Sequence, residues 1–330
     1  MSVLITGGAG YIGRHMVLML LEAGEEVIVI DDLSTGFRES VSNKAKLIVG
    51  DIGDENLIRK TIHQHKVNEI IDFAGDLIVP ESIRDPLIYY RNNVSKTRLL
   101  IATAIETGIK NFIFSSSCSV YGEIEKIIAH EDDTLTPLSP YGRSKLMVEW
   151  ILEDVARAYD FTYVALRYFN VAGADPLGRV GESKLNPTVI TKMAVQAALG
   201  VRPSVVVFGN DYPTEDGTCV RDYVQVTDLC LAHFLALEYL RKGGESQVLN
   251  CGYMKGFSVL EVINAVKRVS EIDFKVEFSK RRIGDPASVI ADNTKIRQLL
   301  KWKPQYDNLD IIVKQALLWE KHLQKLSIST

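Results

Sequence analysis

Cysteine is scarce in this 330-residue chain, and its four cysteines, Cys118, Cys219, Cys230 and Cys251, form no CxxC pair. Their spacing argues against a disulfide framework and against a metal site, and it is typical of reduced thiols in a cytoplasmic protein. Long apolar runs are also lacking, since none approaches the ~18 residues that cross a membrane. The first residues, MSVLITGGAG, lack the basic region of a signal peptide. We therefore expect a cytoplasmic protein with no membrane segment.

A large excess of charge is absent as well. The net charge of −4 gives no electrostatic reason to expect nucleic acid as a partner. Apolar residues make up 46% of the chain and charged residues 24%, which is typical of a soluble globular protein with a sizeable core. The length predicts one large domain or two ordinary ones.

Short apolar runs alternate with helical periodicity through the first half of the chain. This alternation predicts right-handed βαβ units and a parallel sheet, which is an α/β, Rossmann-type doubly wound fold. The predicted strands lie at 2–6, 26–31, 46–51, 68–75, 111–117 and 161–173, and the predicted helices at 14–24, 55–65, 94–108 and 140–160.

The alternation of predicted strands and helices becomes less regular from about residue 174. A strand is predicted at 204–209, and helices at 185–200, 227–240, 258–269 and 309–325. Ser258 and Glu261 form a capping-box pattern at the start of one helix. We predict a domain at 1–173 that binds a dinucleotide and a smaller mixed α/β lobe at 174–330 that binds substrate, with some chain returning to the first domain.

A glycine-rich turn follows the first predicted strand. Gly8, Gly10 and Gly13 satisfy GxGxxG, and Gly7, Gly10 and Gly13 satisfy GxxGxxG. Between a strand and a helix, such glycines permit a tight turn and close approach of backbone N–H groups to a pyrophosphate. Asp31 lies 18 residues after Gly13, close to the position of a carboxylate that binds the adenosine ribose. A carboxylate there repels a 2′-phosphate, so NAD is favoured over NADP; the alternative is a solvated turn.

Other small or polar residues also follow predicted strands. Asp51, Phe73 to Gly75, and Ser115 to Ser117 each stand at a strand end. Because ligands of parallel sheets bind beyond the carboxyl ends of the strands, these residues indicate one shared site rather than separate loops.

Tyr141 and Lys145 lie four residues apart in PYGRSK. If Pro140 opens a helix, both side chains share one face. A lysine ammonium beside a phenol favours the phenolate, which predicts an acid/base pair that faces Ser117. The alternative is that the pair is a common feature of many helices.

Two arginines of the second half, Arg221 and Arg282, are separated by 60 intervening residues. They are suited to clamping a diphosphate, because a guanidinium presents its donors as a fork. Surface salt bridges are the alternative.

Across nearly its whole length the chain resembles the UDP-glucose 4-epimerase family, within the extended short-chain dehydrogenase/reductases. The resemblance rests on GGAGYIG, DDLSTG, GDI, FAG, the Asn92–Asn93 pair, SSSCSVYG, SPYGRSKLMVE, RYFNVAG, FGNDYPTEDGTCVRDYV and RRIGD. It implies NAD-dependent interconversion of UDP-galactose and UDP-glucose through a transient 4-keto sugar, in galactose metabolism or in sugar-nucleotide supply for polysaccharides. It also implies a homodimer that forms through helices near 95–108 and 141–158.

The resemblance assigns catalysis to Ser117, Tyr141 and Lys145. Lys145 would hold the nicotinamide ribose and lower the pKa of Tyr141. The implied cofactor residues are Gly7, Gly10, Tyr11, Ile12, Gly13, Asp31, Asp32, Ser34, Thr35, Asp51, Ile52, Phe73, Ala74, Gly75, Asn92, Tyr141 and Lys145. The implied substrate residues are Ser117, Tyr141, Phe169, Asn170, Phe208, Arg221, Arg282 and Asp285.

The chain departs from the family pattern at several positions. Asp72 stands where the family usually has His, Pro80 where it has Gly, and Arg14 where it has Ser. SKLNP at 183–187 replaces NNLMP, so Lys184 puts a charge in place of an amide. Val289 occupies a place where some members carry a tyrosine, and in the family a small residue there accompanies acceptance of N-acetylated sugars.

Three alternatives remain open from the sequence. A 4,6-dehydratase is disfavoured, because Cys118 and Ser119, rather than an acidic pair, follow Ser117. A 4-epimerase of UDP-N-acetylglucosamine or UDP-xylose is possible. A non-catalytic NAD-sensing regulator is disfavoured because the chain keeps serine, tyrosine and lysine at the catalytic positions.

Overall fold

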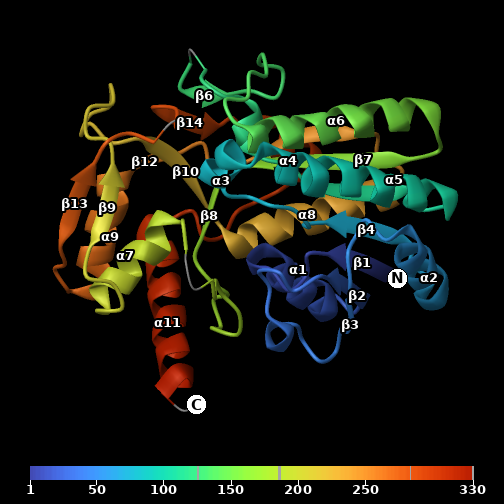
Figure 1. The fold of residues 1–330 in the computed structure, drawn as a ribbon, viewed down its shortest axis with the longest axis horizontal. Helices are drawn as coiled ribbons and strands as arrows, with labels where there is room; N and C mark the ends of the chain where they lie inside the picture. The colour runs from blue at the N-terminus through green and yellow to red at the C-terminus, as the bar shows by residue number, and fades with distance from the viewer. Residues whose placement is uncertain (125, 185–186, 283, 329–330) are drawn as a thin grey trace.

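The computed structural model describes residues 1–124, 126–184, 187–282 and 284–328. Its largest element is a seven-stranded parallel sheet in the order β11-β7-β5-β4-β1-β2-β3 (Figure 1). The strands are β1 (Ser2–Thr6), β2 (Glu26–Asp31), β3 (Lys46–Val49), β4 (Glu69–Asp72), β5 (Asn111–Ser115), β7 (Thr162–Tyr168) and β11 (Gln247–Cys251). The predicted Rossmann-type α/β fold is therefore confirmed.

Helices cover both faces of this sheet because side chains of each buried strand alternate between the faces. Val3 and Ile5 point to the face covered by α1 (Tyr11–Glu22) and α8 (Val226–Arg241). Leu4 points to the opposite face. That face is covered by α2 (Glu55–His65), α5 (Thr97–Glu106) and α6 (Pro140–Ala158). Both faces are apolar, as the near-continuous hydrophobic runs of the strands predict.

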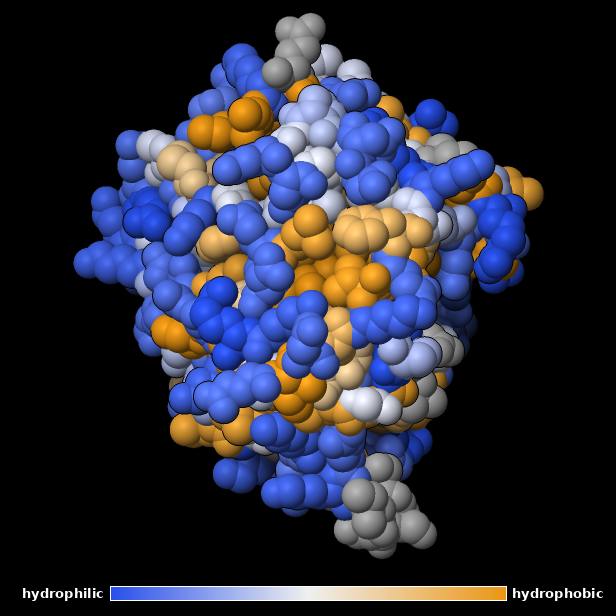
Figure 2. Space-filling model, turned by 90° about the vertical axis from the view of Figure 1, so that its left-hand side faces the viewer, coloured by the Kyte–Doolittle hydropathy of each residue, from blue (hydrophilic) through white to orange (hydrophobic). Residues whose placement is uncertain are grey.

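The second lobe holds two smaller sheets, with the strand orders β12-β10-β14-β6 and β13-β9, and β8 pairs with β10. Apolar side chains gather at the centre of its outer face (Figure 2). The lobe's strands are β6 (Ile128–Ala129), β8 (Asn170–Ala172), β9 (Val205–Phe208), β10 (Val220–Gln225), β12 (Gly256–Ser258), β13 (Val276–Ser279) and β14 (Ser288–Ala291). Its helices are α7 (Ile190–Ala198), α9 (Val259–Ser270), α10 (Thr294–Leu300) and α11 (Leu309–Ile328).

Some element boundaries differ from the sequence prediction. The expected single strand at 161–173 is two strands, because the chain leaves β7 at Phe169 and enters β8 beside β10. The expected helix at 94–108 begins with the π-helical segment η2 (Tyr90–Lys96) and continues as α5. Two short helices, α3 (Val79–Arg84) and α4 (Pro86–Tyr89), lie where none was predicted. The capping box of Ser258 and Glu261 is confirmed at the start of α9.

Within the described part of the chain, no helix combines the length and apolarity that crossing a membrane requires.

A buried ion pair fixes α6 to the sheet. Arg167 on β7 donates to both carboxylate oxygens of Glu149 on α6, with N–O distances of 2.7 to 3.2 Å. Ser116 also donates to Glu149, and Arg167 donates to the hydroxyl of Tyr121 at 3.1 Å. Arg167 and Glu149 are only 3% and 4% exposed. Burial of such a pair costs desolvation energy, but loss of one partner leaves the other charge buried without a counter-charge.

Replacement of Glu149 by Gln should therefore destabilise the fold. We expect the free energy of unfolding to fall by about 3 kcal/mol, since Arg167 loses its buried counter-charge. Urea unfolding followed by circular dichroism measures the change. The matched control is Glu153→Gln on the same helix, because Glu153 pairs with Arg157 at the surface and such pairs contribute less than ~0.5 kcal/mol. Equal effects of the two substitutions would contradict this account.

Candidate active site

The glycine turn between β1 and α1 brings backbone groups into close contact. Gly7 adopts a φ of +66°, which favours glycine. A Cβ atom on Gly13 would lie 2.2 Å from the carbonyl oxygen of Gly7, so a side chain there would collide with the turn. Gly10 caps α1 without a side-chain hydrogen bond. The turn therefore presents the N-terminus of α1 unobstructed by side chains, as an anion site requires.

The end of β2 lies against this turn. The Asp31 carboxylate accepts hydrogen bonds from the backbone N–H groups of Ala9, at 2.9 Å, and Leu33, at 2.8 Å. Burial raises the pKa of Asp31, and these two bonds oppose that shift. Asp32 is exposed and accepts hydrogen bonds from Ser34. The predicted ribose carboxylate is thus next to the glycine turn.

The remaining predicted cofactor residues extend along the same edge of the sheet. Asp51, beyond β3, pairs with Lys96 at 2.5 Å. Although burial opposes ionisation, this ion pair lowers the pKa of Asp51. Thr35 is exposed, Ile52 is buried, and the side chain of Tyr11 donates to the carbonyl oxygen of Gly173 at 2.7 Å.

The segment after β4 meets α6. Ala74 follows Phe73, whose ring lies 4.8 Å from the His233 ring. A Cβ on Gly75 would lie 3.8 Å from the ammonium nitrogen of Lys145. It would also lie 3.0 Å from the Asn93 side-chain oxygen, which is a tight contact, so this loop packs closely on Asn93 beside the predicted catalytic lysine.

Ser117, Tyr141 and Lys145 come together at the carboxyl ends of β5 and β4. Ser139 caps α6 through the backbone N–H of Gly142, with Pro140 as the first helical residue, as the sequence predicts. Tyr141, in the first turn of α6, lies close enough to Ser117 for that side chain to act on the tyrosine pKa. Lys145, one turn later, donates to the carbonyl oxygen of Ser115 at 2.8 Å. All three side chains are buried.

The prediction that Lys145 lowers the pKa of Tyr141 is wrong when the side chains of the protein are considered alone. Burial raises the pKa of Tyr141 well above its ordinary value, and the Ser117 side chain opposes this. Burial also lowers the pKa of Lys145 to about 8. The physical reason is that removal from water disfavours phenolate and ammonium alike, and this effect exceeds the attraction between them.

Strand pairing brings the predicted substrate residues together beside Ser117. Asn170 on β8 pairs with Tyr223 on β10, and Arg221 on β10 pairs with Val289 on β14. Phe169 packs in one buried cluster with Val289. Arg221 also opposes the raised pKa of Cys118, the residue after Ser117. The second lobe thus faces the catalytic residues.

The predicted nucleotide residues lie nearby. The Arg282 guanidinium carbon is 3.8 Å from the centre of the Phe208 ring, a cation–π contact. Arg221, Arg282 and Asp285 all act electrostatically on the Cys219 thiol, whose pKa is raised by burial. Surface salt bridges do not explain Arg282, since its guanidinium stacks on an aromatic ring. Leu185 and Asn186 of the predicted 183–187 segment, and Ile283, lie outside the described residues.

Sequence reasoning missed two residues that support this site. Asn93, rather than Asn92, has a buried side chain, which donates to Ser144 on α6 at 3.0 Å and accepts from the backbone N–H of Asp76. Asn92 donates to the Asp76 carboxylate at 2.7 Å. Glu149 is the other residue, and its signal was available: it lies four residues after Lys145, on the same helix face.

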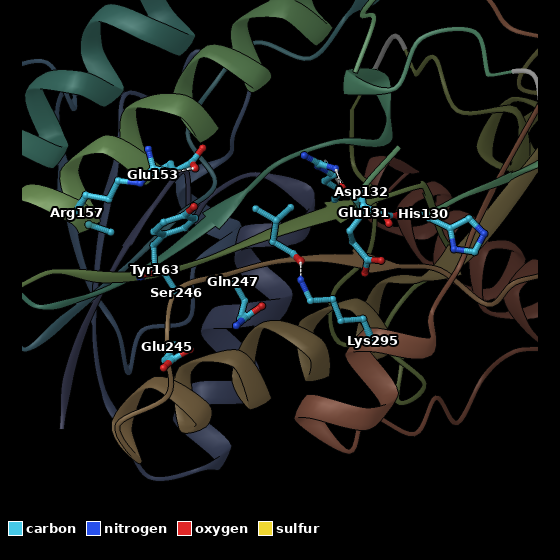
Figure 3. A pocket seen from close by; sticks show the side chains of 13 residues that line it. His130, Glu131, Asp132, Glu153, Arg157, Tyr163, Glu245, Ser246, Gln247 and Lys295 are labelled. Carbon is cyan, nitrogen blue, oxygen red and sulfur yellow. Dashed lines mark hydrogen bonds and ion pairs between the residues drawn. The ribbon is translucent and has the colours of Figure 1, made fainter. Parts of the chain in front are cut away.

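A surface pocket of about 830 Å³ lies elsewhere, between the edge strand β11 and the second half of α6 (Figure 3). Charged side chains of both signs line it. None of its lining residues is a predicted site residue. The lining residues are His130, Glu131, Asp132, Glu153, Ala156, Arg157, Tyr163, Arg167, Glu245, Ser246, Gln247, Val248 and Lys295.

Comparison with known proteins gives consistent results. The sequence profile of the NAD dependent epimerase/dehydratase family matches residues 3–252. The chain is 46% identical over 323 residues to the UDP-glucose 4-epimerase of Azospirillum brasilense, covering 98% of this chain and 93% of that one. The UDP-glucose 4-epimerase of Brucella ovis, solved with NAD, superimposes with a TM-score of 0.92 at 40% identity, over 96% and 97% of the chains. The UDP-glucose 4-epimerase of Bifidobacterium longum, solved with NAD+ and UDP, superimposes with a TM-score of 0.93 at 35% identity, over 98% of both chains.

Proposed function

This chain belongs to the NAD-dependent epimerase/dehydratase family, and we propose that it interconverts UDP-galactose and UDP-glucose by inverting carbon 4 of the sugar. The observation that carries the proposal is that Ser117, Tyr141 and Lys145 are all buried at the carboxyl ends of the strands, with Tyr141 and Lys145 one turn apart on α6. The enzyme is an isomerase, and relatives are named for the same reaction.

The residues at the strand ends fit NAD. The turn at Gly7, Gly10 and Gly13 leaves room for a pyrophosphate, and Asp31 is next to it for the ribose hydroxyls. Tyr11, Ile12, Asp32, Ser34, Thr35, Asp51, Ile52, Phe73, Ala74, Gly75 and Asn92 complete the proposed cofactor set. When bound, NAD+ supplies a hydride acceptor and a positive charge beside the phenol.

Tyr141 moves the proton of the proposed reaction. Its phenolic oxygen takes the proton of the sugar's 4-hydroxyl and later returns it to the same oxygen, after the sugar has turned its opposite face to the hydride donor, while Ser117 holds that oxygen by a hydrogen bond. Because burial raises the pKa of Tyr141, a positive charge must stabilise its phenolate. Lys145 contributes such a charge as an ammonium and orients the nicotinamide ribose.

The second lobe binds the sugar nucleotide. Arg221 and Arg282 take the diphosphate, since a guanidinium fork matches its oxygens. Asp285 accepts hydrogen bonds from the ribose of the uridine. Phe169, Asn170 and Phe208 line the path between the nucleotide and Ser117. Support comes from the pairing of β8, β10 and β14, which gathers these residues on one side of the site.

We further propose that residues 1–173 form the cofactor domain and that residues 174–330 form the substrate lobe, from which α8 and β11 return to the large sheet. The proposed location is the cytoplasm, and the proposed role is galactose metabolism or sugar-nucleotide supply. A 4-epimerase of another UDP-sugar and an NAD-sensing regulator are not favoured, because relatives at 46% and 44% identity are enzymes named UDP-glucose 4-epimerase.

The exposed faces of α4 and α6 support a homodimer. Leu87 is 76% exposed and Trp150 is 54% exposed, and large apolar side chains gathered at a surface indicate an interaction site. The two helices pack against each other, so both side chains can belong to one interface.

Light scattering of the purified protein tests this assembly. We expect a particle of twice the chain mass of 36.8 kDa. A particle of one chain mass at micromolar concentration would contradict the proposal.

Replacement of Tyr141 by Phe tests the function itself. Removal of the proton-transferring oxygen should lower kcat for UDP-galactose by about 1000-fold, while bound NAD, measured after denaturation, stays unchanged. The matched control is Tyr159→Phe at the far end of α6, where the side chain is exposed and where we expect wild-type turnover. A Tyr141→Phe variant that keeps more than a tenth of the activity would overturn the proposal.

A further inference from the structure

Asp72, at the carboxyl end of β4, is a carboxylate held deep in the sheet. It is 1% exposed, and its register partners are Thr6 on β1 and Phe114 on β5. One carboxylate oxygen accepts hydrogen bonds from the Thr6 hydroxyl, at 2.5 Å, and from the Ala74 N–H, at 3.2 Å. The other oxygen is buried and has no hydrogen-bond donor among the described residues. An unsatisfied buried oxygen of this kind needs an explanation.

Lys145 reaches over the same strand ends from α6. Its ammonium donates to Ser115, the residue that follows Asp72's register partner Phe114, and lies 4.9 Å from the centre of the Phe114 ring. It also lies near Gly75, three residues after Asp72. The ammonium and the carboxylate form no close ion pair within the described structure, but both are removed from water, so their attraction is weakly screened.

Glu149, the other carboxylate that acts on Lys145, is already neutralised by Arg167. Apart from Asp72 and Glu149, the buried titratable groups around Lys145 and Tyr141 are shifted toward their neutral forms. Burial raises the pKa values of Tyr141, Tyr168 and Tyr89.

The imidazole on α8 is neutral too. Burial lowers the pKa of His233, which lies against Phe73 and Tyr168, to about 4.

Burial raises the pKa of Asp72, while the Thr6 hydrogen bond, the charge of Lys145 and the Ala74 N–H oppose that shift. Of the two carboxylates that act on Lys145, Asp72 is the one without an arginine partner.

We propose that Asp72 is a positioning residue of the epimerase: its buried carboxylate, fixed by Thr6 and Ala74, keeps Lys145 as an ammonium beside Tyr141. The inference rests on the proposed function for the role of Lys145. It also explains why this chain has Asp72 where the family usually has His, since the aspartate places a negative charge near Lys145.

The titration of Lys145 supports the same conclusion. Burial lowers the pKa of Lys145 to about 8, and Asp72 is the largest influence that opposes this shift. Without the Asp72 charge, the lysine pKa falls further, so the ammonium is lost at a lower pH. When the pH is raised, activity that depends on the ammonium should therefore begin to decline at a lower pH than in the wild type.

Asp72→Asn is the sharpest variant. The amide keeps an oxygen for Thr6 and Ala74, and its NH2 group occupies the side that has no donor. We expect the alkaline limb of kcat/KM for UDP-galactose to move down by about one pH unit, which corresponds to ~1.4 kcal/mol. Activity at pH 6.5 should stay within about threefold of wild type, with unchanged bound NAD.

Glu69→Gln is the matched control. Glu69 is a buried carboxylate at the opposite end of the same strand and pairs with Arg241, about 10 Å along β4 from Asp72. We expect no shift of its pH profile. An Asp72→Asn profile that coincides with wild type, in a folded holoenzyme, would overturn the proposal, and so would equal shifts in both variants.

A direct titration of Lys145 separates this proposal from the proposed function. Trace acetylation of the holoenzyme with acetic anhydride at several pH values, read by peptide mass spectrometry, reports the pKa of the amine without turnover. The proposal expects a lysine that is mostly charged at pH 7 in the wild type, and a lower pKa in Asp72→Asn. A wild-type lysine that is mostly neutral at pH 7 would overturn it, even if the variant fails to fold.

Discussion

The bidentate ion pair between Arg167 and Glu149 is the interaction on which the site depends. It joins β7 to α6 inside the protein, and Ser116 donates to the same carboxylate. Ser117 follows Ser116, and Lys145 and Tyr141 precede Glu149 on α6 by about one turn and just over two turns. This one cluster therefore fixes all three catalytic side chains relative to one another. The buried pair costs desolvation energy, which the fold tolerates because the pair orients a rigid helix over the strand ends.

Burial gives the site its chemistry. It raises the pKa of Tyr141 and lowers the pKa of Lys145, so it shifts both groups toward their neutral forms. Positive charge near the phenol then controls when Tyr141 releases its proton. In this account, Asp72 maintains one such charge on Lys145, and the bound cofactor would supply the other. Proton transfer is thereby tied to the presence of the cofactor.

Much of the site could be predicted from local sequence signals. The glycines from Gly7 to Gly13 and the acid Asp31 are recognisable because a tight turn and a ribose carboxylate need those residues at that spacing. Pro140 and Tyr141 were placed in a first helical turn for similar reasons. The sequence analysis expected some chain to return to the first domain, but it could not identify β11 as the returning strand, because strand order depends on long-range pairing. The break between β7 and β8 at Phe169 depends on pairing with β10 in the same way.

The direction in which the pKa of Tyr141 shifts also could not be predicted from the sequence, since it depends on how much water the folded chain excludes. The four-residue spacing shows that Lys145 is near Tyr141. Only the extent of burial decides whether desolvation or the lysine charge has the larger effect on the tyrosine pKa.

The most direct test of the central claim follows the hydrogen at carbon 4. UDP-galactose that carries deuterium at this carbon is incubated with the purified protein, with no NAD added, and the product is analysed by mass spectrometry. The account predicts UDP-glucose that retains the deuterium, because the hydride returns to the sugar from which it came. Absence of UDP-glucose when NAD is bound to the protein, or loss of the deuterium to solvent, would contradict the account.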